Sequence, residues 1–416
     1  MHKFTAALLV RFSLVLFAVG PVAAQTGNTA SPLVFLDCAA CDFSYIRREV
    51  PFVNWVRDRE DAVVHILVTD QRTAAGGRDF VLDFLGRKQH ADSNGSLRYV
   101  AQQGDSDDVE RQGLAQILKI GLLPYLADSP ILSRLQVSYA AVAGAVAPAA
   151  TTADDPWDSW VFKIDGSGWL QRESQLTEIS LDGGLTADRI TEDWRIRNYL
   201  DLDYDEDRFQ SNGLDAQSQS HHWAQRSNIV RSIGPHWSVG IAAEVWSDTY
   251  DNTRLGLRLA PAMEFSYWPY VLDRKQRLTV AYHLGSRSLD YRERTIFGHK
   301  SETRFEERLQ IDLELTQPWG SVRGRLEGSH YFHDVNRYRV ESWGRVSLRL
   351  FRGLALDLEA GVERINDQLS LAVGGATLEE VLLRRRELAT DYKVWSRAGL
   401  SYTFGSIYNN VVNTRL

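Results

Sequence analysis

The chain has 416 residues and a formal net charge of −7, which allows two or three domains and argues against a nucleic-acid partner. Its 12 Trp and 16 Tyr are many for a soluble enzyme but typical of a membrane β-barrel with aromatic girdles. A mean hydropathy of −0.29 does not exclude such a barrel, because half of each strand faces a polar lumen.

Residues 1–24 have the pattern of a secretory signal peptide. Basic residues precede the apolar run 12–19, and small residues stand before a cleavage point at Gln25. No later run reaches the roughly 20 apolar residues that a membrane helix needs. We therefore expect an exported protein without a helical membrane anchor.

Residues 31–130 predict a small mixed α/β domain in the periplasm. The expected strands are 33–37, 62–69, 80–85 and 97–102, and the expected helices are 43–56 and 107–125. The order β-α-β-β-β-α occurs in several periplasmic domains of envelope machines, which is an analogy of fold alone. Residues 131–156, which are rich in alanine, predict a linker to the rest of the chain.

From residue 157 to residue 416, apolar and polar residues alternate strand after strand. In residues 308–315, Leu, Ile, Leu and Leu occupy one face, whereas Arg308, Gln310, Asp312 and Glu314 occupy the other. A soluble sandwich would not need charges on one whole face of most strands. The pattern predicts a transmembrane antiparallel β-barrel of about 12 strands, starting near residues 160, 176, 194, 223, 237, 255, 278, 308, 322, 339, 354 and 393.

The expected connections alternate between short turns and long polar loops, as in outer-membrane barrels with short periplasmic turns. Long loops are expected at 201–220, 247–253, 289–303, 333–337 and 366–391. Aromatic residues cluster beside the short turns and predict a periplasmic-side girdle: Trp237, Tyr267, Trp268, Tyr270, Trp319 and Phe351.

Consecutive strands carry complementary charges on the face expected to line the lumen. The residues of this expected charge network are Arg308, Asp312, Glu314, Arg323, Arg325, Glu327, Arg345, Arg349, Asp357 and Glu359. Arg–carboxylate ladders between neighbouring strands could form a charged constriction in a selective pore, or a structural network that fills a narrow barrel. Balanced charges neutralise each other, which favours the structural network.

The loop 366–391 contains a capping box, because Thr377 is followed by Glu380. The box predicts a helix with Leu378, Val381 and Leu382 on one face. Such a helix could plug or gate the barrel mouth, or it could lie outside as a solvated loop helix.

Three other groups could carry chemistry. Cys38 and Cys41 lie between a strand and a helix, as in redox motifs, but the rest of that pattern is missing, which favours a disulfide. His221 and His222 fall in an expected polar loop without a carboxylate at ligand spacing, so solvated residues are expected rather than a metal site. Ser329 and His330 are adjacent on a strand and would point to opposite faces, so they cannot act as nucleophile and base together.

Two segments carry a resemblance to a known family. Residues 38–47 read Cys-Ala-Ala-Cys-Asp-Phe-Ser-Tyr-Ile-Arg, and residues 404–413 read Phe-Gly-Ser-Ile-Tyr-Asn-Asn-Val-Val-Asn. With the signal and the two-part layout, the chain resembles a family of outer-membrane β-barrel proteins of Gram-negative-type bacteria with an N-terminal periplasmic domain. The resemblance implies location and architecture, and it implies no activity and no functional residues.

The sequence favours a narrow channel or transporter for small polar solutes, or an envelope structural protein, in the outer membrane. The alternatives are an assembly or scaffold factor that acts through its periplasmic domain, and a redox or lipid-acting enzyme. We expect no catalytic, metal or cofactor site. The expected partners are outer-membrane lipid, the barrel-assembly machinery and a periplasmic protein.

Overall fold

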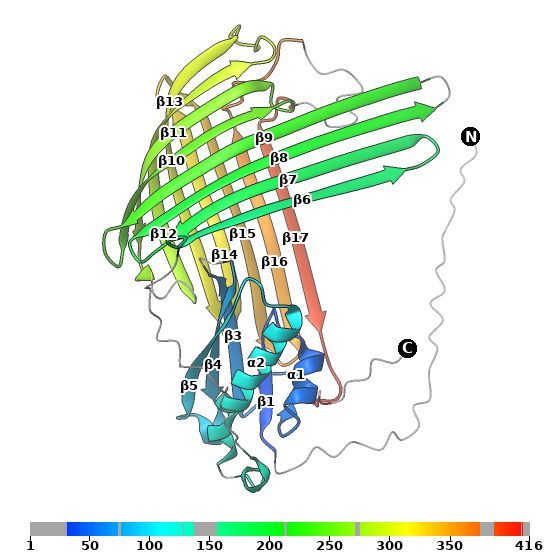
Figure 1. The fold of residues 1–416 in the computed structure, drawn as a ribbon, viewed down its shortest axis with the longest axis vertical. Coiled ribbons are helices and arrows are strands. Elements are labelled where there is room, and N and C mark those ends of the chain that lie inside the picture. The colour runs from blue at the N-terminus through cyan, green and yellow to red at the C-terminus, as the bar shows by residue number, and fades with distance from the viewer. Residues whose placement is uncertain are drawn as a thin grey trace, which may run out of the picture.

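The computed structural model describes residues 31–73, 76–127, 129–136, 156–211, 214–270, 275–374, 387–408 and 410, with the side chains of 211 and 214–216 left aside. The predicted signal peptide and most of the predicted linker lie outside these residues. The protein is mainly β: a small α/β domain is followed by a twelve-stranded antiparallel sheet (Figure 1). Among the described residues, no helix has both the length and the apolar content needed to cross a membrane.

The N-terminal domain is a five-stranded mixed sheet in the order β2-β1-β3-β4-β5, with β1 parallel to both of its neighbours. The predicted helix 43–56 is wrong in its second half. Val50 leaves the helical conformation before Pro51, whose ring disfavours helix in the preceding residue, and residues 54–55 form a strand. The elements are β1 Leu33–Asp37, α1 Phe43–Glu49, β2 Asn54–Trp55, β3 Val64–Arg72, β4 Arg78–Gly86, β5 Asn94–Ala101 and α2 Asp107–Leu122, with short 3-10 turns at Lys88–His90, Leu123–Leu126 and Leu132–Arg134.

The core of this domain lies between the sheet and α2. Ile66 and Phe80 from the sheet meet Leu118 and Leu122 from the helix, and all four are fully buried. Each such side chain contributes roughly 1.5–3 kcal/mol when it leaves water. The Ser106 side chain accepts the Val109 N–H and caps the start of α2. The domain therefore has a hydrophobic core of its own.

The twelve strands of the second sheet follow each other in sequence order, and each pairs with the next. The predicted number of strands and eleven of the twelve predicted starts agree with the structure to within seven residues; β9 begins nine residues early. The strands are β6 Trp160–Arg172, β7 Leu176–Ile190, β8 Trp194–Ser211, β9 Leu214–Ser232, β10 Trp237–Asp248, β11 Thr253–Ser266, β12 Gln276–Tyr291, β13 Ser301–Gln317, β14 Gly320–Tyr331, β15 Asp334–Phe351, β16 Leu354–Ile365 and β17 Tyr392–Tyr402.

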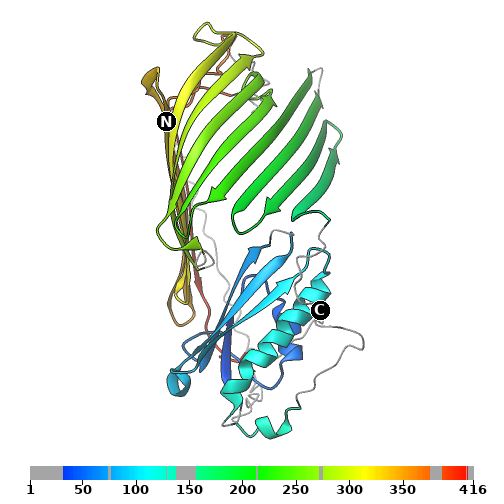
Figure 2. The same cartoon turned by 60° about the vertical axis from the view of Figure 1, so that its left-hand side comes forward.

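This sheet is strongly curved but open (Figure 2). The edge strands β6 and β17 each have a single neighbour within the described part of the chain. The structure therefore shows the antiparallel sheet that the sequence predicts, and it does not show that sheet closed into a barrel.

Several predicted long loops are wrong, because the strands continue through them. Residues 201–220 form the outer halves of β8 and β9, with Asp203 opposite His222 and Glu206 opposite Gln219. Both faces of this hairpin are polar, so its sequence resembles that of a loop. Strands pair through their backbones, however, and this pairing needs no apolar face. Residues 247–253 and 333–337 are likewise strand ends around tight turns, whereas 292–300 and the described residues 366–374 and 387–391 lie outside the strands.

The N-terminal domain contacts the sheet at the side of its short turns. Arg59 donates to the carbonyl of Pro318, in the β13–β14 turn, at 2.6 Å. Lys275, just before β12, forms an ion pair with Asp83 of β4 at 2.6 Å. These contacts place the domain beyond the short-turn ends of β11 to β17 (Figure 1).

The chain end that follows β17 returns to the N-terminal domain. The backbone N–H of Arg57 donates to the carbonyl of Ile407 at 3.1 Å, and the Trp55 N–H donates to the Asn410 side chain at 2.6 Å. Val56 and Tyr408 form an antiparallel bridge. The segment after the last strand therefore lines the edge of the domain beside β2, so that both ends of the described chain meet in one interface.

Candidate functional site

The two faces of the twelve-stranded sheet differ in an unusual way. On one face, which we call the apolar face, Ile241, Leu259 and Leu309 are 48%, 50% and 45% exposed. On the opposite face, the charged face, Arg258 and Glu306 are only 7% and 4% exposed. Other side chains of the charged face are more open, with Arg323 and Arg325 58% and 43% exposed. A soluble sheet would bury its apolar face in a core, so this sheet, with an exposed apolar face and buried ion pairs on the opposite face, has the inverse distribution.

Three ion pairs of the expected network join β13 to β14 on the charged face. Arg325 lies 2.7 Å from Asp312, and Arg323 lies 2.9 Å from Glu314. Both pairs join residues that are directly opposite in the strand register, where side chains share a face. A third pair joins Arg308 to Glu327 diagonally, at 3.2 Å.

The expected ladder does not continue in the same way to β15 and β16. Arg345 lies opposite both Arg323 and Glu359, yet within the described residues no ion pair holds its guanidinium. Asp357 accepts a hydrogen bond from Ser347 at 2.5 Å instead of an Arg contact. Glu327 has no arginine of β15 opposite it, since the residue at that position is Glu341.

Arg349 does not belong to the expected network on the sheet. Its guanidinium binds both carboxylate oxygens of Asp37 at 2.5 Å, across the interface with the N-terminal domain. It also lies over the Phe35 ring, 5.7 Å from the centroid. A bidentate Arg–carboxylate contact is strongly directional, so Arg349 fixes how the domain docks.

Sequence reasoning missed several ion pairs on the charged face, among them the one between its most buried charges. Glu306 of β13 forms ion pairs with Arg258 of β11 and, at 3.4 Å, with Arg287 of β12. Arg339 binds Glu363 at 2.6 Å. All of these residues stand at polar positions of the alternating pattern. Nothing in the sequence, however, indicates that Glu306 of β13 reaches Arg258 of β11 across β12.

A polar cavity of about 410 Å³ lies on the charged face near the long-loop ends. The loop after β16 folds into it: Gln368 and Ser370 line the cavity, and Leu369 is only 6% exposed. Arg339 and Asp367, 2.9 Å apart, tie the start of this loop to the charged face. The helix predicted from Thr377 lies largely outside the described residues.

The cysteines form a disulfide. Cys38 and Cys41 are bonded, with their Cα atoms 5.6 Å apart, directly before α1. Cys38 is buried in the domain core, and Asp37 beside it holds Arg349. The bridge therefore lies beside the contact between the domain and the sheet.

His222 lies on strand β9 and not in a loop as expected. Its Nε2 is 3.0 Å from Asp201 and its Nδ1 is 3.1 Å from Asp248, and Asp203 is close enough to complete a possible metal-ligand group. Asp201 is also held by Arg226 at 2.6 Å. Both ring nitrogens of His222 thus contact carboxylates, and the four groups form one cross-strand polar network.

Ser329 and His330 lie on opposite faces of β14, as expected for adjacent strand residues. Ser329 pairs with Arg308 on the charged face, and His330 contacts Glu307 at 2.6 Å on the apolar face. The two side chains therefore do not form a nucleophile–base pair.

Asp37, in the N-terminal domain, is a titrating group that holds the domain against the twelve-stranded sheet. Its burial disfavours the ionised form, but hydrogen bonding and charge from His65 and Arg349 hold the pKa of Asp37 below its ordinary value. A carboxyl with a lowered pKa stabilises the folded state above its ordinary pKa, and it loses that contribution as the pH falls through the lowered value.

We expect the docking of the domain to weaken as the pH falls through the lowered pKa of Asp37, where the docked carboxyl becomes protonated. Asp37→Asn should weaken it already at neutral pH, because the amide cannot form the ion pair with Arg349. Hydrogen exchange of residues 33–37 and 348–353 would report the loss. Asp92→Asn, an exposed carboxyl of the same domain, is the control, and equal exchange in both variants would refute a role for Asp37.

The fold and the site define a class: a mainly β protein in which an α/β domain docks on a curved sheet with one apolar and one charged face. No family model matches the chain, and no curated protein matches it either.

Proposed function

We propose that the protein is an outer-membrane β-barrel that forms a narrow channel for small polar solutes, with its N-terminal domain in the periplasm. The observation that carries this proposal is the inverted distribution on the sheet. Leu257, Leu284 and Leu326 on the apolar face are 46–48% exposed, and lipid is the solvent that would cover such a band. The charged face would then line the lumen.

The proposal requires that β6 and β17 pair and close the sheet. Both are exposed edge strands, and their unpaired backbone groups could not cross lipid in that state. β6 starts and β17 ends at the short-turn side, so the two strands run antiparallel, as closure requires. Their apolar rows, with Phe162 and Ile164 on β6 and Leu400 on β17, would continue the apolar face across the seam.

The orientation follows from the position of the N-terminal domain. The domain lies at the short-turn side, and an exported chain would keep those turns in the periplasm. Part of its sheet also approaches the charged face: Leu67 and Thr69 of β3 line a cavity together with Arg323 and Asp357. The domain and the cross-strand ion pairs would narrow the exit, so we propose a small conductance for the intact protein.

Closure is tested by cysteine cross-linking in a Cys38→Ser, Cys41→Ser background. Ile164→Cys is combined with a single cysteine at position 396, 398 or 400 of β17. Because facing strand residues lie about 4.5–5.5 Å apart, one combination should form a disulfide after insertion into membranes. Leu326→Cys with Ser342→Cys, which face each other on β14 and β15, is the positive control. Cross-linking of the control and of none of the three combinations would contradict closure.

A further inference from the structure

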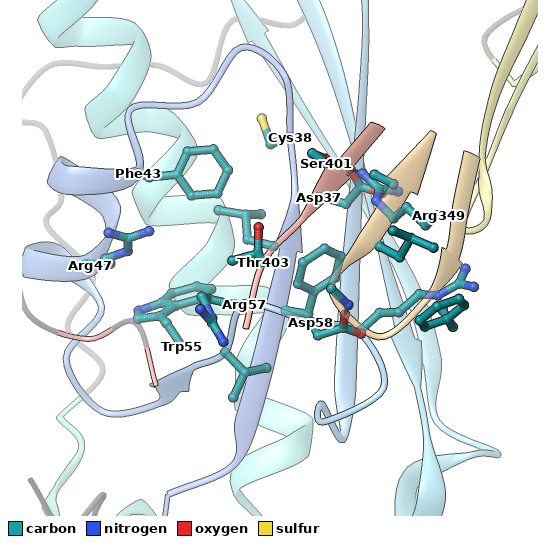
Figure 3. Close-up of a pocket in the computed structure, with 18 of the residues that line it drawn as sticks. Asp37, Cys38, Phe43, Arg47, Trp55, Arg57, Asp58, Arg349, Ser401 and Thr403 are labelled. Carbon is teal, nitrogen blue, oxygen red and sulfur yellow. Dashed lines mark hydrogen bonds and ion pairs between the residues drawn. The ribbon is translucent and has the colours of Figure 1, made fainter. Parts of the chain in front are cut away.

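A second cavity lies between the N-terminal domain and the short-turn ends of β15 to β17 (Figure 3). It also measures about 410 Å³, which is enough for a small organic molecule. Its walls come from β1, α1 and the segment around β2 on one side, and from the ends of β15, β16 and β17 on the other. Of the ten residues of the expected charge network, only Arg349 lines it.

One part of this cavity is apolar and aromatic. Phe35 and Phe43 belong to the domain, Trp55 lies at its edge strand, and Phe351 and Leu354 flank the turn between β15 and β16. Trp55 is only 4% exposed, and its indole N–H donates to the Val50 carbonyl at 3.2 Å, which holds the ring in place. Such walls suit an apolar body of a ligand.

The other part carries an excess of positive charge. Four guanidinium groups line the cavity, from Arg47, Arg57, Arg59 and Arg349, against two carboxylates, from Asp37 and Asp58. Both carboxylates already have partners: Asp37 binds Arg349, and Asp58 accepts the Gly353 backbone N–H at 2.5 Å.

Arg47 and Arg57 lack acidic partners within the described residues. Arg47 lies one helical turn after Phe43, with its guanidinium 5.7 Å from the ring centroid, and burial lowers the pKa of Arg47 without removing its charge. Arg57 donates one N–H to the Phe404 carbonyl at 3.1 Å, while its Nε is buried without a hydrogen-bond partner there. Both guanidinium groups keep their charge in a protein, so the cavity has positive charge that no carboxylate of the described residues neutralises, and an anion would balance it.

We propose that this cavity binds an amphiphilic anion, with a carboxylate or phosphate held by Arg47 and Arg57 and an apolar body between Phe43, Trp55 and Phe351. This inference rests on the proposed barrel, because the ligand would reach the cavity from the lumen or from the inner leaflet of the membrane, and both would end there. The same chemistry could come from a free organic acid or from an anionic lipid.

The test is calorimetric titration of the full-length protein, in nanodiscs of zwitterionic phosphatidylcholine, with decanoate. Empty nanodiscs provide the baseline for partition into lipid. We expect saturable binding that weakens about tenfold or more in Arg47→Gln, since a charge-assisted contact is lost. Arg48→Gln is the matched control, because Arg48 is the next residue but is exposed beside Tyr45 and does not line the cavity.

Decanol, which has the same chain without the charge, should bind about tenfold more weakly than decanoate. Absence of saturable decanoate binding, equal binding of decanol, or an equal effect of Arg48→Gln would overturn the proposal. Arg47 forms no hydrogen bond to another described residue, so the Arg47→Gln variant should fold. Closure of the barrel is measured separately by the cross-linking test, so a failure of the barrel and a failure of ligand binding can be distinguished. Competition by phosphatidylglycerol nanodiscs would identify a lipid source, and unchanged decanoate affinity would identify a free acid.

Discussion

Replacing Ile311 by arginine is expected to destabilise the protein folded in a bilayer by about 2–4 kcal/mol, which is the cost of an arginine on the lipid side near mid-membrane. Ile311 lies opposite Val280 on β12 and Leu326 on β14, so three apolar side chains share the apolar face at this height. Denaturant titration of the protein refolded in lipid vesicles would measure the loss.

Gln310→Arg is the matched control for this variant. Gln310 is the preceding residue, and it faces Ala281 and Glu327 on the charged face. An arginine there meets a polar surface and an acid, so we expect a much smaller change in the free energy of folding. A loss for Gln310→Arg as large as that for Ile311→Arg would show that the apolar face does not meet lipid.

The second large effect is expected from the charged face. Replacing Arg323, Arg325 and Arg345 by serine removes three long side chains from neighbouring strands and breaks the ion pairs with Asp312 at 2.7 Å and with Glu314 at 2.9 Å. Glu314 keeps only Arg277, at 3.2 Å. The lumen should become wider and more negative, so conductance across planar bilayers should rise and the current should favour cations.

Arg349 is kept in that variant, because it binds Asp37 and its loss would disturb the docking of the domain. Arg364→Ser, on the apolar side of β16, controls for the general loss of positive charge. If the wild-type protein has a large, steady conductance and the triple variant leaves it unchanged, the protein is an open pore and not a narrow channel.

The sequence predicts the repeated elements of this fold well, because each strand carries its own signal. The alternation around Leu309, Ile311 and Leu313 is local, and so is the sequence of residues 31–130 that predicts an α/β domain. Strand order then follows from short connections, which make consecutive antiparallel strands neighbours. The faces of the predicted network residues could therefore be assigned from the sequence.

Contacts between distant segments could not be predicted in the same way. Arg349 and Asp37 are 312 positions apart, and an arginine in a strand pattern gives no sign of a partner in another domain. Glu306 reaches Arg258 across β12, whereas pattern reasoning considers only adjacent strands. The residues around Arg57 and Phe404 likewise form a cavity only when both ends of the chain meet.

The most direct test of the proposed membrane barrel is the environment of two adjacent residues. Ile311→Cys and Gln310→Cys are each labelled with a nitroxide in protein reconstituted into vesicles; the native cysteines, Cys38 and Cys41, are joined in a disulfide and would not react. The proposal predicts that the label at 311 collides with oxygen dissolved in lipid, and that the label at 310 is shielded from lipid. Equal access of a water-soluble nickel chelate to both labels, or lipid contact at 310 instead of 311, would contradict it.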